Sequence, residues 1–94
     1  MSYVTVSHWS ATEWDNAMEE IAAEKFVPMI MGVGASSVQM VCSGDLSMCV
    51  ITQYADEATA LSAQQKIADI RAQAASQFPM KMDSAHAGSV FAAG

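Results

Sequence analysis

Basic residues are scarce in this sequence. Four lysines and arginines occur among 94 residues, against ten aspartates and glutamates, and the formal net charge is −6. The four basic positions lie far apart in the chain and form no cluster. Nucleic acids and anionic membrane surfaces are bound through clustered positive charge, so we expect neither as a partner.

Signals that direct a chain into or across a membrane are also lacking. The sequence contains no run of about 18 apolar residues, the length needed to span a bilayer. The first ten residues carry neither the basic stretch nor the apolar stretch of a secretory signal. We therefore expect a cytoplasmic protein.

Cysteine and histidine are limited to two residues each. Cys42 and Cys49 do not have the spacing of a CxxC redox or zinc pair. A disulfide would need a hairpin that places them opposite each other, and a reducing cytosol favours two buried thiols instead. His8 and His86 add no recognised ligand spacing, so we expect neither a metal nor a cofactor. GxSxG, GxGxxG, Walker and HExxH motifs are absent as well.

Apolar residues, in contrast, are abundant. The chain is 52% hydrophobic and only 15% charged, which is apolar for a small soluble monomer. Its length predicts a single domain, residues 1–94, and a chain this short buries only ~60–65% of the surface that its unfolded form exposes. We expect a second copy of the chain to cover part of the apolar surface.

Hydrophobic periodicity and helix caps predict six elements. Ser10 and Glu13 have the spacing of a capping box for the first helix, and Thr12 with Asp15 offers an alternative register. Pro28 disfavours helical geometry before it and is expected to end or kink that helix. The elements are a strand at 2–10, a helix at about 12–26, strands at 36–43 and 47–54, a helix capped by Asp56 that runs to about 77, and a strand at about 80–91 that Gly88 could break. The buried stripe predicted for the second helix consists of Ala60, Ala63, Ile67, Ile70, Ala74 and Phe78.

The order β-α-β-β-α-β predicts an α+β protein with a four-stranded antiparallel sheet and both helices on one face. Both sides of the central strands are apolar, with Val38, Met40 and Val50 on one side and Val41, Cys49 and Ile51 on the other. The helices can cover only one of these sets. The uncovered set predicts a homodimer.

This pattern resembles the dimeric α+β barrel superfamily, which includes antibiotic-biosynthesis-monooxygenase-like proteins. The closest local likeness is the segment GASSVQMVCSGDLSMCVITQYADEATA, residues 34–60. The resemblance implies a ferredoxin-like protomer, two sheets packed face to face, and a cleft between each sheet and its helices. Some members are cofactor-independent oxygenases and others degrade haem. The second helix here has neither the Trp nor the His typical of the haem-degrading members, so we do not expect haem degradation.

Candidate site residues concentrate in VTVSHWSATEW near the start of the chain. His8 and His86 lie on the first and last strands, which are neighbours in this fold, so both could face the cleft as acid or base. Each could equally make a single hydrogen bond at an interface or strand end. Trp9 could form a wall against a flat ligand or could simply pack. Gln53 and Tyr54 complete the expected substrate contacts.

We therefore hypothesise a homodimer that binds a small apolar or aromatic molecule and acts as a cofactor-independent monooxygenase or isomerase. In this hypothesis His8 and His86 are catalytic, and Trp9, Gln53 and Tyr54 contact the substrate. The alternative is a non-catalytic ligand-binding or protein-interaction module. A closed, partly polar cavity that touches a histidine favours the enzyme, and a filled interior favours the module.

Overall fold

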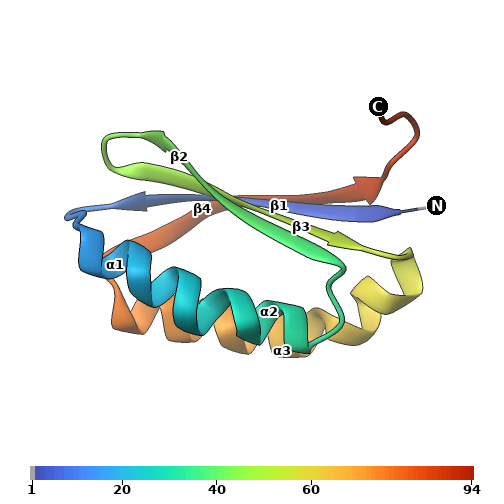
Figure 1. The fold of residues 1–94 in the computed structure, drawn as a ribbon, viewed down its shortest axis with the longest axis horizontal. Coiled ribbons are helices and arrows are strands. Elements are labelled where there is room, and N and C mark those ends of the chain that lie inside the picture. The colour runs from blue at the N-terminus through green and yellow to red at the C-terminus, as the bar shows by residue number, and fades with distance from the viewer. Residues whose placement is uncertain (1) are drawn as a thin grey trace.

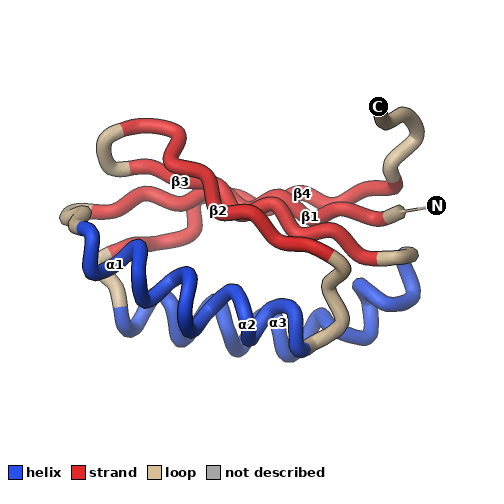
Figure 2. Tube along the Cα trace, viewed as in Figure 1, coloured by secondary structure: helices blue, strands red, loops and turns tan. Residues whose placement is uncertain are grey.

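One face of a four-stranded sheet is covered by two helical segments (Figures 1 and 2). The strands are antiparallel and lie in the order β2-β3-β1-β4. This arrangement confirms the predicted fold class. The computed structural model describes residues 2–94, and its elements are β1 (Tyr3–Ala11), α1 (Asn16–Ile21), the π-helical turn η1 (Ala22–Phe26), α2 (Val27–Gly32), β2 (Ser37–Gly44), β3 (Ser47–Tyr54), α3 (Glu57–Gln77) and β4 (Met80–Ser89).

The first helix starts later than either predicted capping register. Ser10 and Thr12 do not cap it, because β1 continues to Ala11 and the Thr12 N–H donates to the Pro79 carbonyl at 2.9 Å. Asp15 is the N-cap instead, and its Oδ1 accepts from the Met18 N–H at 2.9 Å. This hydrogen bond to Pro79 holds Thr12 outside the helix, which therefore begins only at Asn16.

Pro28 does not end this helix. A π turn, η1, precedes it, and the Val27 N–H bonds to the Ala22 carbonyl five residues back. Pro28 then lies in the first turn of α2, directly after the π turn. The helix consequently runs through α1, η1 and α2 to Gly32, and the predicted end at residue 26 is wrong. Gly34, at φ 116, then makes the turn into β2.

The second helix, α3, has the predicted cap and buried face. Asp56 Oδ1 accepts hydrogen bonds from the Thr59 hydroxyl at 2.7 Å and the Thr59 N–H at 2.8 Å, and these bonds lower the pKa of Asp56. The predicted apolar stripe faces the core throughout. Its buried members are Ala60, Ala63 and Ile70, followed by Phe78 beyond the helix end, and Ile67 and Ala74 are half-buried against the same core.

Strand register determines which side chains face the helices. In the β2–β3 hairpin Cys42 pairs with Met48, and Cys49 pairs with Val41. The two cysteines consequently lie on opposite faces of the sheet, which excludes a disulfide between them, and both thiols are free. The predicted burial of both is wrong, because Cys42 is exposed and Cys49 is half-buried. In β4 the expected break at Gly88 does not occur, because Gly88 pairs with Val4. The register shifts instead opposite His8 and Trp9.

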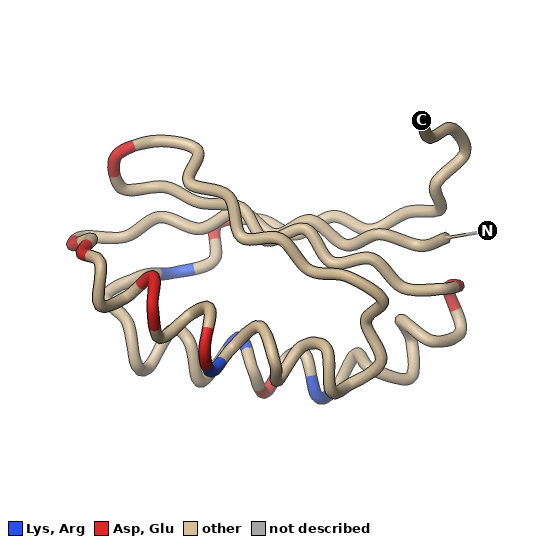
Figure 3. The backbone as a smooth tube through the Cα atoms, viewed as in Figure 1, with Lys and Arg blue, Asp and Glu red and all other residues tan. Residues whose placement is uncertain are grey.

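Val38, Met40 and Val50 pack against the core beneath the helices, so they form the set that the helices cover. The opposite side of the sheet, which we call the open face, carries Val4, Val6, Val41, Cys49 and Ile51. Charged residues lie mainly on the helices and loops, and most of the sheet has none (Figure 3). Within residues 2–94 no helix is long and apolar enough to cross a membrane.

Candidate functional site

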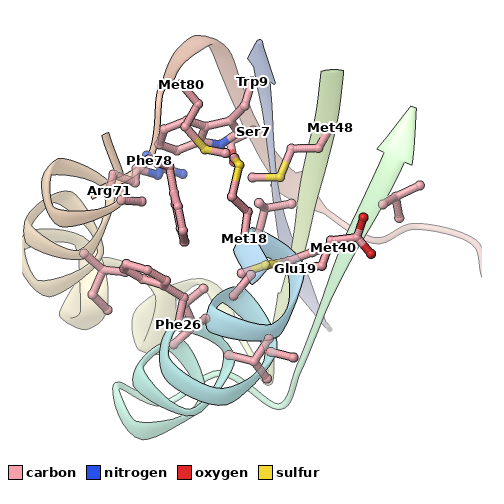
Figure 4. Close-up of a pocket in the computed structure, with 18 of the residues that line it drawn as sticks. Ser7, Trp9, Met18, Glu19, Phe26, Met40, Met48, Arg71, Phe78 and Met80 are labelled. Carbon is pink, nitrogen blue, oxygen red and sulfur yellow. The ribbon is translucent and has the colours of Figure 1, made fainter. Parts of the chain in front are cut away.

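A cavity of about 360 Å³ lies between the sheet and the helices (Figure 4). This volume is within the range of ~300–1,000 Å³ that is typical of small-molecule sites. Four strands and both helical segments contribute to its wall. Ser7 and Trp9 come from β1, Phe26 from η1, Met48 from β3 and Phe78 from the turn before β4.

Alternation along β1 directs Ser7 and Trp9 toward the helices, where their exposed fractions are 3% and 4%. The Trp9 indole N–H donates to Ser7 Oγ at 2.9 Å. This bond satisfies the indole nitrogen within the wall, so the ring presents an apolar surface held in one orientation. Thr52 on β3, 4% exposed, adds a second hydroxyl to the same wall.

The π turn contributes small side chains to the cavity. Ala22 and Ala23 of η1 line it together with Phe26. Two alanines at these positions leave space that larger side chains would fill. Four methionines form much of the remaining wall, and their flexible thioether chains can adapt to ligands of different shape. They are Met18, Met40, Met48 and Met80.

Two charged side chains border this largely apolar cavity. Glu19 on α1 accepts a hydrogen bond from the Trp14 indole N–H at 2.7 Å, which positions its carboxylate. Arg71 on α3 is half-buried, and burial lowers the pKa of its guanidinium, while the nearby Tyr54 acts in the opposite direction. The two lie on opposite sides of the cavity in Figure 4.

The histidines do not face this cavity, contrary to the sequence-based expectation. His8 lies between Ser7 and Trp9 and therefore points to the open face. His86, opposite Val6 in the register, lies on the same face, and the two rings are 6.4 Å apart between centroids at 68°. The topology brings the histidines together as predicted, but on the side of the sheet away from the helices.

The other expected contacts are divided between sites. Trp9 lines the cavity. Gln53 lies on the open face, and its Nε2 donates to Ser2 Oγ at 3.2 Å. Tyr54, 1% exposed, belongs to the core and borders a smaller hollow of about 190 Å³ beside β4, which Arg71 and His86 also border. Burial raises the pKa of the Tyr54 phenol, partly offset by Arg71.

Sequence reasoning missed Ser7, Thr52 and Arg71 as cavity residues. The signal for Ser7 and Thr52 was present, because each lies two positions from an aromatic residue, Trp9 or Tyr54, on an alternating strand. Arg71 follows directly after Ile70 of the predicted buried stripe, so the sequence also indicated a position for Arg71 at the edge of the core. Within residues 2–94 no group of three His, Cys, Asp or Glu side chains is placed to hold a metal ion.

No protein-family model and no curated protein matches the sequence. Solved structures are similar over nearly the whole chain. A dimeric ferredoxin-like protein from an uncultured marine organism has a TM-score of 0.69 and 14% identity, covering 98% of this chain and 97% of its own. A protein of unknown function from Nitrosomonas europaea has a TM-score of 0.69 and 18% identity, covering 100% of this chain and 94% of its own. These similarities establish a ferredoxin-like fold for this chain and assign it no activity.

Proposed function

We propose that this protein binds a small apolar, ring-containing molecule in the cavity between sheet and helices. The observation that carries the proposal is the combination of an open volume of about 360 Å³ with a wall of aromatic and methionine side chains. A core that served packing alone would fill this space, because protein interiors are close-packed. Trp9, held by Ser7, supplies a flat surface on which a ring can stack.

Binding without turnover is the function that this cavity supports best. The described residues that line it include no histidine, and its ionisable groups are Glu19, Cys42 and Arg71. A monooxygenase or isomerase that used His8 or His86 would need the substrate on the open face, where both rings lie. The non-catalytic alternative from the sequence is therefore the one we propose.

We also propose that the binding protein is a homodimer joined through the open face. Val4, Val6 and Ile51 are half-buried there, Val41 is 41% exposed, and no helix covers them. The similar marine protein is described as dimeric. A second copy of the same apolar face is a self-complementary partner, as two-fold symmetry requires.

Isothermal titration calorimetry with 2-naphthamide, a neutral ring compound, tests the binding site. Ala22→Phe should fill the cavity and weaken binding at least tenfold. Ala72→Phe places the same side chain at an exposed position of α3 and should not. Equal affinity of both variants would contradict the cavity as the site. Mass spectrometry of the compound after incubation with the protein should show no product, and a product would favour the enzyme.

A further inference from the structure

We infer that the ligand of this cavity carries one anionic group, a carboxylate, and that Arg71 binds it. This inference rests on the proposed ligand-binding function and adds a chemical class to it. The class is an apolar ring that bears a single acid group.

Arg71 projects from α3 at the boundary between two hollows. It lines the main cavity together with Trp9 and Phe78, and it also lines the smaller hollow beside β4. Figure 4 shows its nitrogen atoms among the side chains of the cavity wall. A guanidinium in this position can contact a ligand group at the α3 side of the cavity without any movement of the helix backbone.

Within residues 2–94 the Arg71 guanidinium makes no hydrogen bond to another side chain. The nearest acid on its own helix, Asp69, accepts from Gln65 at 3.2 Å instead. Within the same residues no fully buried side-chain nitrogen lacks a partner. The Arg71 nitrogens must therefore retain accessible surface, so they remain open to a ligand.

The surroundings of Arg71 favour binding of an anion. Burial lowers the pKa of its guanidinium, and the group that opposes this effect is the Tyr54 phenol, not a carboxylate. Burial raises the pKa of Tyr54, so the phenol is uncharged at neutral pH. Arginine nevertheless stays protonated at neutral pH. A desolvated, uncompensated positive charge is unfavourable, and a carboxylate can relieve it through two parallel hydrogen bonds to the planar guanidinium.

Glu19 determines the orientation of such a ligand. Its carboxylate is held by Trp14 and lies across the cavity from Arg71 (Figure 4). A ligand anion near Glu19 would be repelled, and one near Arg71 would be attracted. The acid group therefore points to α3, and the ring lies against the methionines and Trp9.

Calorimetric titration at neutral pH with 2-naphthoate and 2-naphthamide tests the inference, because the two compounds share a ring and differ in charge. The native protein should bind the carboxylate about tenfold or more tightly than the amide. Arg71→Gln should remove this preference by weakening 2-naphthoate alone, and Arg71→Lys should restore part of it. Lys66→Gln, which removes an exposed positive charge from the same helix, should leave both affinities unchanged.

The outcomes separate the inference from the proposed function. Equal affinity of the native protein for both compounds would overturn the role of Arg71 and leave cavity binding intact. The comparison uses the native chain, so it decides the matter even if Arg71→Gln fails to fold. An equal loss of affinity in Lys66→Gln would show a general charge effect and overturn the specific role. Failure of both compounds to bind would overturn the proposed function itself.

Discussion

At the scale of single residues, one position separates a cavity residue from an exposed one. Ser7 and Trp9 line the cavity, whereas His8 between them lies on the open face. Alternation along β1 places Trp9 on the face opposite Val4 and Val6. The same alternation would have placed His8 with Val4 and Val6, away from the helices. His8 and His86 are neighbours in the sheet, but adjacency in the sheet does not place their side chains on the cavity side.

The helix cap gives a residue-scale prediction. Asp15→Ala should lower the free energy of unfolding by about 1 kcal/mol, because it leaves the Met18 N–H without its acceptor. Ser10→Ala should cost less than about 0.5 kcal/mol, since Ser10 only donates an exposed bond to Asp83. Chemical denaturation of both variants measures the difference. A larger loss in Ser10→Ala would support the capping box that the sequence suggested.

Ionisation of Tyr54 should make the free energy of unfolding depend on pH in the alkaline range. Burial raises the pKa of its phenol in the folded protein above 10, so the unfolded chain releases this proton first. The contribution of Tyr54 to stability is complete below about pH 10 and is lost as pH rises toward the folded pKa, by at most about 1.4 kcal/mol per pH unit. Unfolding measured between pH 9 and 11 should show a weaker decline in Tyr54→Phe. A decline altered by Tyr3→Phe instead would contradict this assignment.

At the scale of elements, the predictions succeeded where local and tertiary signals agreed. In α3 the Asp56 cap and the apolar stripe point to the same helix, and both are present. In the first helix they conflict. Pro28 predicts an end, whereas burial of Ile30 requires the helix to continue, and the π turn before Pro28 reconciles the two. The helix propensities of single residues do not indicate such a turn, so neither η1 nor its contribution to the cavity could be predicted.

Amide hydrogen exchange tests the continued helix. The amides of Met31 and Gly32 lie within α2 and should exchange at least tenfold more slowly than the same amides in an unstructured peptide. A helix that ended at Phe26 would leave Met31 and Gly32 as unprotected as a loop. Exchange at the rate of an unstructured peptide at these two positions would contradict the structure of α2.

At the scale of the whole molecule, the sheet divides the chain into two functional sides. One side holds the cavity, and the other carries Val4, Val6, Val41 and Ile51 without a covering element. The count of faces was readable from the sequence, because it requires only the element order and the alternation of the strands. The family resemblance implied a cleft between the sheet and the helices, but the volume of the cavity and most of its lining residues could not be predicted, because they depend on how side chains from distant elements pack.

Ile51→Asp tests the homodimer that we propose. Ile51 lies near the middle of the open face, opposite Val6 on β1 and Gln39 on β2. A stable interface buries ~1,200 Å² or more, and an aspartate inside it would be desolvated without a partner, at a cost of several kcal/mol. Light scattering at micromolar concentration should give a dimer for the native chain and a monomer for the variant. Ala72→Asp, at an exposed position of α3, should remain dimeric.

Coupling between folding and association supplies an independent measurement. A dimer that unfolds to monomers has a thermal midpoint that rises with protein concentration, because mass action favours the associated state. The native chain and Ala72→Asp should show this rise, and Ile51→Asp should not. A native midpoint that stayed constant over a hundredfold range of concentration, together with a monomer mass, would contradict the homodimer. The cavity lies on the other side of the sheet, so that result would not bear on ligand binding. The proposed binding site and the proposed homodimer are therefore tested independently.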